Sequence, residues 1–232
     1  MCKIYLLKKQ KMSTKFIVSI IFICCSLKGF SQENSEKHSV KDYPDGYYMT
    51  LEDFLAKKVI KADGLIRSDV KTRKVITAET NADQAFFIMV SDSAKVKKAF
   101  AISYNRDLYF RQAFFTKYAS KGDRVDAAVN PNSYHRVIMD GNFFYMEAVF
   151  ANTWKTAVSS NMGIAGSAMA SSAYQLKPIV FNFETQRFDL FRNCEDFNAF
   201  LASRDSPNVV NCDSRYITLE KMKAVLEDEI KR

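Results

Sequence analysis

Three aromatic-rich stretches decide the fold: FAISYNRDLYF (Phe100–Phe110), HRVIMDGNFFYM (His135–Met146) and FNFETQRFDL (Phe181–Leu190). In each of them apolar and polar residues alternate on both sides of a short turn-forming segment, which is typical of paired β-strands with one buried face. A slip of one residue would turn every side chain to the opposite face, so the alternation also restricts the register. We therefore expect six strands in three hairpins between Lys98 and Arg192.

The turn residues predict how the middle hairpin pairs. Asp140-Gly141 suits a two-residue turn whose residues need positive φ. That turn sets Val137 opposite Phe144 and His135 opposite Met146. One face of this hairpin is then apolar and well buried.

The other two hairpins allow similar predictions. With Thr185-Gln186 as the turn, Phe183 lies opposite Phe188, and like residues face each other on both sides of the pair. For the first hairpin, the sequence allows a two-residue Asn105-Arg106 turn or a three-residue Asn105-Arg106-Asp107 loop. We favour the three-residue loop, because it gathers the apolar side chains of both strands on one face, and Asn and Asp tolerate the left-handed conformation.

Helical spacing of apolar residues outside the hairpins predicts three helices. They are a short helix from Leu51 to Lys57 with Thr50 as its N-cap, a helix over Glu195–Ala202, and a terminal helix over Leu219–Lys231 capped by Thr218.

Weaker patterns complete the list of expected elements. The run Ala85–Val90 predicts a buried strand. Residues 65–79 have a weaker strand pattern, which is clearest over Lys74–Thr80. Tyr118–Ser133 contains Gly122, Pro131 and several charges, which indicates a long surface connection.

The first thirty-one residues have the pattern of an export signal. Lysines precede a short apolar run, Phe16–Cys25, and a small residue stands before the expected cleavage site between Ser31 and Gln32. The run is shorter than the roughly 20 apolar residues of a spanning helix, and Met12 is an alternative start. We expect a polar disordered segment over 32–42, a single domain over 43–232, and an exported protein that is periplasmic, on the cell surface or extracellular.

The charge balance changes once this leader is set aside. The whole chain has 34 basic and 26 acidic residues, a net charge of +8. Residues 1–31 contain six lysines and no acid, which leaves 28 basic against 26 acidic residues, a net charge of +2. Nucleic-acid binding would need a concentrated basic patch, so the composition gives no support for that function.

The cysteines agree with export. Cys2, Cys24 and Cys25 lie in the leader, so Cys194 and Cys212 are the two that remain. In an oxidising compartment two such thiols commonly pair, and a disulfide between them is expected. Two separate buried thiols are the alternative.

Together these patterns predict an α+β single domain. Its core is a curled antiparallel sheet of about eight strands, a roll or partly closed barrel, with a short N-terminal helix and two C-terminal helices. Four stretches also resemble a family of exported Gram-negative bacterial proteins of unknown function: DGYYMTLEDF (Asp45–Phe54), FAISYNRDLYF, NPNSYHRVIMDGNFFYMEA (Asn130–Ala148) and FRNCEDFNAF (Phe191–Phe200). The resemblance implies export and a single domain, and it implies no activity.

Candidate chemistry is sparse. His38 lies in the polar segment, so His135 is the one imidazole that could act as a general base in the fold. A histidine hydrogen-bonded to backbone is the competing interpretation. Two histidines and two cysteines without HExxH or CxxC spacing provide no metal site, and no cofactor motif is present.

An uncharged segment, Thr156–Leu176, has small residues at every fourth position. Gly163, Gly166 and Ser167 could support close helix packing in self-association, insertion into the envelope or ligand contact. A small-residue helix or loop packed on the sheet is favoured, because Ser, Asn and Gln make transfer into lipid unfavourable.

Three functions remain open. The favoured one is a non-enzymatic exported module that binds a protein partner or an envelope component. The second is a binder of a small apolar ligand inside the curled sheet, which requires a cavity of roughly 300 Å³ lined by Phe and Met. The third is a hydrolase that uses His135 with a carboxylate, which requires that residue in a cleft beside Asp or Glu.

Overall fold

The computed structural model describes residues 37–69, 83–120, 127–151, 174–212 and 217–232. The described strands form two antiparallel sheets. The six-stranded sheet has the order β1 (Gly46–Tyr48), β4 (Ala101–Tyr104), β5 (Asp107–Arg111), β7 (Tyr134–Arg136), β3 (Gln84–Met89) and β2 (Leu65–Asp69). The four-stranded sheet has the order β10 (Arg187–Leu190), β9 (Tyr174–Asn182), β8 (Phe143–Ala151) and β6 (Ala127–Ala128).

Helices and a 3₁₀ turn accompany the sheets. They are the turn η1 (Val40–Asp42) and the helices α2 (Leu51–Leu55), α3 (Gln112–Lys117), α6 (Cys194–Ser203) and α7 (Leu219–Lys231). The predicted α+β class is thus confirmed, with its short N-terminal helix and two C-terminal helices. The strands divide between two sheets, because β8 and β9 pair with each other and with β6 and β10, and not with any strand of the six-stranded sheet.

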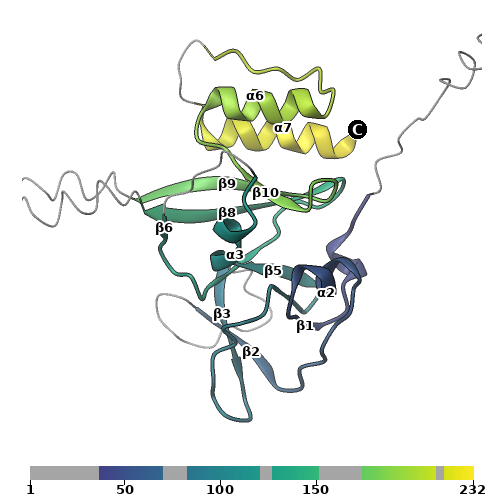
Figure 1. Cartoon of the computed structure of the whole chain (residues 1–232), viewed down its shortest axis with the longest axis vertical. Helices are drawn as coiled ribbons and strands as arrows, with labels where there is room; N and C mark the ends of the chain where they lie inside the picture. Colours follow the sequence, from purple (N-terminus) through teal and green to yellow (C-terminus); the bar gives the residue numbers. More distant parts are fainter. Residues whose placement is uncertain (1–36, 70–82, 121–126, 152–173, 213–216) are drawn as a thin grey trace, which may run out of the picture. The chain divides into compact units, whose positions relative to one another are not determined.

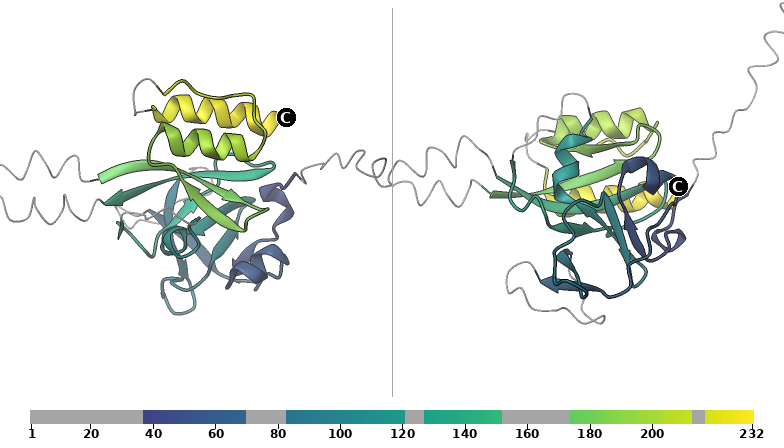
Figure 2. Two further views of the ribbon diagram at one scale, coloured as in Figure 1. Left: turned by 45° about the horizontal axis from the view of Figure 1, so that its top comes forward. Right: turned by 60° about the horizontal axis from the view of Figure 1, so that its bottom comes forward.

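The elements of the domain form layers. The helices α6 and α7 lie side by side on one face of the four-stranded sheet, and the six-stranded sheet lies on its other face (Figures 1 and 2). One apolar cluster fills the space between the sheets, and it includes Phe100 and Phe110 from one sheet and Phe144, Phe181 and Phe188 from the other. All five of these phenylalanines have no exposed surface. The interior between the sheets is therefore filled by aromatic side chains.

Alternation along β8 and β9 explains why the four-stranded sheet is buried on both faces. Phe144 and Phe181 point to the other sheet, whereas their neighbours Tyr145 and Val180 belong to the cluster under α6 and α7. Side chains of consecutive strand residues point to opposite faces. The consecutive apolar residues Phe143–Met146 and Ile179–Phe181 thus bury both faces of this part of the sheet, whereas the start of β9 is exposed.

The helices α2 and α7 begin where the sequence predicts. Thr50 accepts a hydrogen bond from the Asp53 amide at 3.0 Å, and Thr218 accepts one from the Lys221 amide at 3.3 Å. Each bond satisfies a backbone donor that the first helical turn leaves free. The terminal helix has the predicted bounds, Leu219–Lys231.

The predicted registers of all three hairpins are wrong. In the first hairpin Tyr104 pairs with Asp107, so Asn105-Arg106 forms the two-residue turn that was the less favoured of the two predictions. Both turn residues have positive φ, 52° and 67°, as a tight hairpin turn requires. The preferred longer loop assumed a single buried face, but the strands β4 and β5 bury side chains on both faces.

In the last hairpin Phe188 lies opposite Phe181, and the loop is longer than the predicted Thr185-Gln186 turn. The side chain of Asn182 accepts hydrogen bonds from the amides of Glu184 and Thr185, at 2.9 and 3.3 Å, and so stabilises this wider loop. The register shift is two residues, so each side chain keeps the predicted face.

The middle hairpin also differs from its prediction. Met139 bridges Tyr145, and β7 pairs with β3 and β5, so His135 does not lie opposite Met146. A carboxylate oxygen of Asp140 accepts hydrogen bonds from Ser39 Oγ and from the Val40 amide, at 2.9 and 2.8 Å. These contacts hold the chain in a wider loop than an Asp-Gly turn.

Other expectations differ or lie outside the described residues. Residues 37–42, which the sequence placed in a disordered segment, contain η1 with a capping box at Ser39. The connection Tyr118–Ser133 contributes β6 and a bridge from Ala119 to Phe188. The strand expected over Lys74–Thr80 lies outside the described residues, as do positions 156–173 of the uncharged segment.

None of the helices in the described part of the chain combines the length and apolar character that a membrane crossing requires.

Candidate functional site

His135 is buried between the two sheets. It lies on β7, opposite Phe110 of β5, and has 2 % exposed surface. Its Nδ1 lies 2.8 Å from the backbone oxygen of Glu147, and its Nε2 lies 3.3 Å from both Ser133 Oγ and Gln84 Nε2. These partners are a carbonyl, a hydroxyl and an amide, so the contacts of the ring match a core histidine and not a base held by a carboxylate.

The surroundings of His135 also fix its charge. Burial lowers the pKa of the imidazole from its usual 6.5 to about 4, although the bond to Glu147 and the charge of Asp83 act in the opposite direction. The ring is neutral at physiological pH. The Glu147 carbonyl can only accept, so the ring donates from Nδ1 and accepts at Nε2.

A disulfide joins Cys194 and Cys212, as the sequence predicts. The S–S distance is 2.00 Å and the two Cα atoms lie 5.7 Å apart. Asn198 reinforces this connection, because its amide donates to the Val210 carbonyl at 2.7 Å and accepts from the Val210 amide at 2.9 Å. The segment after α6 is thus tied back along the helix by a covalent bond and a pair of hydrogen bonds.

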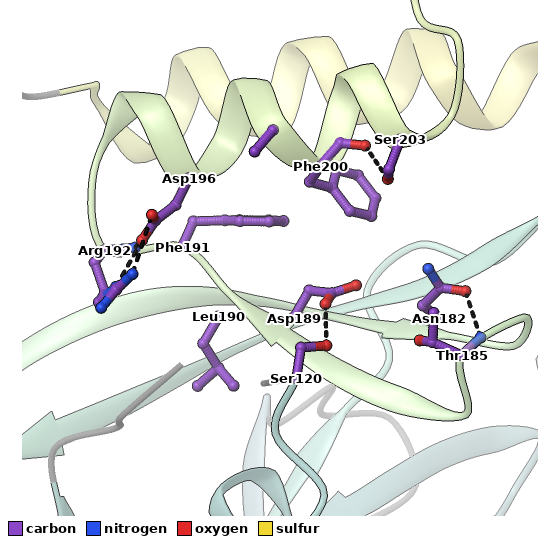
Figure 3. Close-up of a pocket in the computed structure, with 11 residues that line it drawn as sticks. Ser120, Asn182, Thr185, Asp189, Leu190, Phe191, Arg192, Asp196, Phe200 and Ser203 are labelled. Atoms are coloured by element: carbon purple, nitrogen blue, oxygen red, sulfur yellow. Dashed lines mark hydrogen bonds and ion pairs between the residues drawn. The ribbon is translucent and has the colours of Figure 1, made fainter. Parts of the chain in front are cut away.

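A recess of about 320 Å³ lies between α6 and the strands β9 and β10 (Figure 3). Its lining combines aromatic rings with hydroxyl, amide and carboxylate groups. The lining residues are Ser120, Asn182, Thr185, Asp189, Leu190, Phe191, Arg192, Asp196, Ala199, Phe200 and Ser203. This volume falls at the lower end of the range for small-molecule sites, about 300–1,000 Å³.

Strand alternation places the polar groups of this recess. Phe188 and Leu190 of β10 point into the core between the sheets, so Asp189 between them points toward the helices. Asn182 reaches the same face because it follows Phe181 on β9. The apolar–polar–apolar order Phe188-Asp189-Leu190 on β10 thus places the Asp189 carboxylate on the face of the sheet that α6 covers.

Asp189 has several partners. Ser120 Oγ donates a hydrogen bond to one carboxylate oxygen, and the side chain of Asn182 also hydrogen-bonds to this carboxylate. Burial raises the pKa of Asp189, and the bonds from Ser120 and Asn182 and the charge of Arg204 partly offset that rise. The carboxylate is accordingly held in a partly desolvated place, and none of the described residues forms a direct ion pair with it.

An ion pair lies at the start of α6, and a second arginine follows the end of this helix. Arg192 Nε lies 2.6 Å from Asp196 Oδ2, and Arg192 Nη2 lies 3.1 Å from Oδ1, so the contact is bidentate. Arg204, which is 7 % exposed, holds its guanidinium 5.5 Å from the centre of the Phe143 ring and 5.9 Å from that of Phe200. Its Nη1 lies 3.5 Å from the Glu184 carboxylate.

Two rings form the apolar wall. Phe191 and Phe200 lie with their centroids 5.2 Å apart on the helix side of the recess, across from Asp189 and Asn182 on the strands (Figure 3). Both belong to the cluster that packs α6 and α7 on the sheet. The helix side of the recess thus combines these two buried rings with the polar side chains of Arg192, Asp196 and Ser203.

The remaining sequence candidates belong to the uncharged segment. Gly163, Gly166 and Ser167 lie outside the described residues. Over the ranges that the structure describes, no three or more His, Cys, Asp or Glu side chains are grouped as metal ligands.

Comparisons of the chain with protein-family models, with curated proteins and with solved structures give no match.

The recess could be found in the sequence only in part. The two sides of a recess come together only in the fold, and Ser120 stands 69 positions from Asp189. The amide of Ser120 donates to the Phe188 carbonyl at 2.9 Å, so this segment runs beside β10 and presents the hydroxyl. The visible signal was the alternation in FNFETQRFDL, which predicts Asn182 and Asp189 on one face.

Proposed function

We propose that the protein is an exported, non-enzymatic binding module and that the recess between α6 and β10 is its ligand site. The observation that carries the proposal is the lining of the recess. Convergent polar groups on Asn182, Asp189 and Ser120 face the rings of Phe191 and Phe200 across about 320 Å³. Polar groups that converge on a concavity, together with apolar surface, are features of small-molecule sites.

The filled core argues against the second function, a small apolar ligand held between the sheets. Phe100, Phe110, Phe144, Phe181 and Phe188 occupy that space with no exposed surface. A ligand there would have to displace packed aromatic side chains, which is costly in an interior at crystal-like density.

The surroundings of His135 argue against the third function, a hydrolase. A general base must come within hydrogen-bond reach of the proton that it removes. The imidazole of His135 is 2 % exposed, does not line the recess, and already contacts Glu147, Ser133 and Gln84.

Export is supported by the leader-like residues 1–31 and by the Cys194–Cys212 disulfide. Mass spectrometry of the protein recovered from a secreting cell checks this part of the proposal. We expect Gln32 as the first residue, and a cytosolic protein that retains residues 1–31 would contradict export.

A blocking substitution tests the site. Ala199 is exposed on α6 and lines the recess, whereas Ala202 is exposed on the same helix and does not line it. We expect Ala199→Trp to abolish the amide chemical-shift changes that ligands cause around Asn182 and Asp189, and the matched control Ala202→Trp to preserve them. The probes are a set of neutral, cationic, anionic and apolar small molecules added to the full exported chain.

Two results would overturn this proposal. The first is a set of shift changes that lie away from the recess and persist in Ala199→Trp. The second is chemical conversion of a bound probe, detected by mass spectrometry after incubation, because a non-enzymatic module leaves its ligand unchanged.

A further inference from the structure

Asp189 is the charged side chain of the described recess lining that no ion pair neutralises. Arg192 Nε lies 2.6 Å from Asp196 Oδ2, so the charges of these two side chains cancel. The positive charge of Arg204 acts on Asp189, but its Nη1 lies 3.5 Å from the Glu184 carboxylate, with which it is paired. The described lining contains two carboxylates and one guanidinium, which leaves a net charge of −1 on Asp189.

Burial makes this negative charge costly. The Asp189 carboxylate accepts hydrogen bonds from Ser120 and Asn182, and both of these groups are neutral. Burial accordingly raises the pKa of Asp189, because the ionised form lies in a partly desolvated place. A cation bound beside Asp189 would supply the opposite charge, and a charge-assisted hydrogen bond is about twice as strong as a neutral one.

The hydrogen-bonding groups around Asp189 offer a ligand acceptors more than donors. The hydroxyl of Ser120 donates to Asp189, and the hydroxyl of Ser203 donates to the Phe200 carbonyl at 2.7 Å. The NH₂ group of Asn182 is on the Asp189 side, because its oxygen accepts from two amides of the following loop. Lone pairs remain on the Ser203 hydroxyl and on the carboxylate, whose two oxygens offer about four lone-pair sites. The second oxygen of Asp189 points away from Ser120 and toward α6 (Figure 3).

From this charge and these acceptors, and resting on the proposed role of the recess as a ligand site, we propose that the ligand is a small organic cation with a primary ammonium group. An ammonium group has three donors and no acceptor, so it matches the recess in both charge and hydrogen bonding. It donates to Asp189, and its carbon chain lies along Ala199, which is exposed on α6 and lines the recess. An anionic ligand would meet the net negative charge, and a neutral ligand would leave the carboxylate without a counter-charge.

A metal ion matches the recess less well than an ammonium group does. Ca²⁺ takes about six to eight oxygen ligands. The second carboxylate of the lining, Asp196, is held bidentately by Arg192. Among the residues that the structure describes, no three or more His, Cys, Asp or Glu side chains are grouped as ligands. An organic cation therefore fits better, because one carboxylate is enough for it.

Three probes with the same number of carbon atoms test the class. At pH 7 n-butylamine is cationic, n-butanol is neutral and butyrate is anionic. We expect n-butylammonium to give saturable amide shift changes at Asn182 and Asp189, with a dissociation constant at least about tenfold below those of n-butanol and butyrate. Calcium chloride, compared with sodium chloride at equal ionic strength, should not displace it.

A substitution in the recess gives a second measure. Asp189→Asn keeps the shape of the side chain and removes its charge, so n-butylammonium should bind at least about tenfold more weakly and lose its advantage over n-butanol. The matched control is Glu195→Gln, which removes an exposed carboxylate at the start of α6, outside the recess, and should leave binding unchanged. Thermal unfolding of both variants checks that the fold is intact. The order of the three probes on the native protein tests the class independently of either variant.

The outcomes separate the two proposals. Equal or tighter binding of n-butanol, butyrate or Ca²⁺ at Asn182 and Asp189, or no binding of n-butylammonium there, overturns the cation class and leaves the recess as a general ligand site. A preference for n-butylammonium that survives in Asp189→Asn also overturns the class. Shift changes that lie elsewhere for every probe, and that persist in Ala199→Trp, overturn the recess as a site and the cation class with it.

Discussion

At the residue scale, His135 shows how one side chain can be polar, buried and structural. It connects β7 of one sheet to the Glu147 carbonyl of β8 in the other, at 2.8 Å. Nearby, Gln112 donates to the Val149 carbonyl at 2.6 Å and accepts from the Asn130 amide at 3.0 Å. Buried polar groups of this kind are costly when unpaired and specific when paired. The two residues therefore help to fix how the sheets sit on each other.

The lowered pKa of His135 predicts a pH-dependent stability. Between pH 6.5 and about 4 the unfolded chain binds a proton at this residue that the folded chain does not. The free energy of unfolding therefore falls as pH falls through that window, by about 1.4 kcal/mol per pH unit. We expect urea unfolding at several pH values to show this slope, and His135→Asn to remove it.

Asp189 gives the opposite sign and serves as an internal comparison. Its raised pKa means that the folded chain takes up a proton before the unfolded chain does, so its contribution to stability decreases as pH rises. Equal pH slopes in the native protein and in His135→Asn would contradict the structural role given to the imidazole.

At the element scale, the sequence predicted correctly those features that depend only on neighbouring residues in the chain. Thr50 and Thr218 cap the helices that the sequence predicted, because capping needs only a hydroxyl and the next three residues. The hairpin registers were less predictable. Arg106 adopts positive φ although it is not a residue that favours it, and Asn182 widens the last loop through its side chain.

The disulfide is the element-scale feature with the largest expected effect. It closes a separation of 18 residues, for which the chain-entropy model gives about 3 kcal/mol. We expect the double variant Cys194→Ala, Cys212→Ser to lose about that much free energy of unfolding in urea titrations. Reduction of the native protein with dithiothreitol should give a similar loss and should leave the double variant unchanged. Equal stability of the two oxidised proteins would contradict this role.

At the scale of the whole molecule, the sequence predicted the class and the phenylalanine-rich core but not the division into two sheets. The alternation in β8 and β9 is compatible with burial on one face or on both, and only the position of α6 and α7 decides between them. The recess could not be predicted from the sequence either, because its two walls come from different layers of the fold.

The shared core predicts that both sheets unfold together. Phe181 of β9 contacts the rings of Phe54, Phe110 and Phe188, which come from α2 and from both sheets. We expect Phe181→Ala to lower the free energy of unfolding by about 3–5 kcal/mol, with a single transition by circular dichroism and by tyrosine fluorescence. Leu176→Ala on the same strand is the control, since Leu176 is 49 % exposed and should change stability by less than about 1 kcal/mol. Separate transitions for the two probes would contradict a shared core.

The covalent tie behind α6 has a practical consequence for how the protein is made. Phe200, Ala199 and Ser203 reach the recess from the helix that Cys194 anchors. Material produced in a reducing bacterial cytosol would carry two free thiols, and the wall formed by this helix would be held less firmly. Ligand screens on such preparations would miss true binders, so recombinant protein should be directed to the periplasm or refolded with a glutathione redox pair before any binding assay.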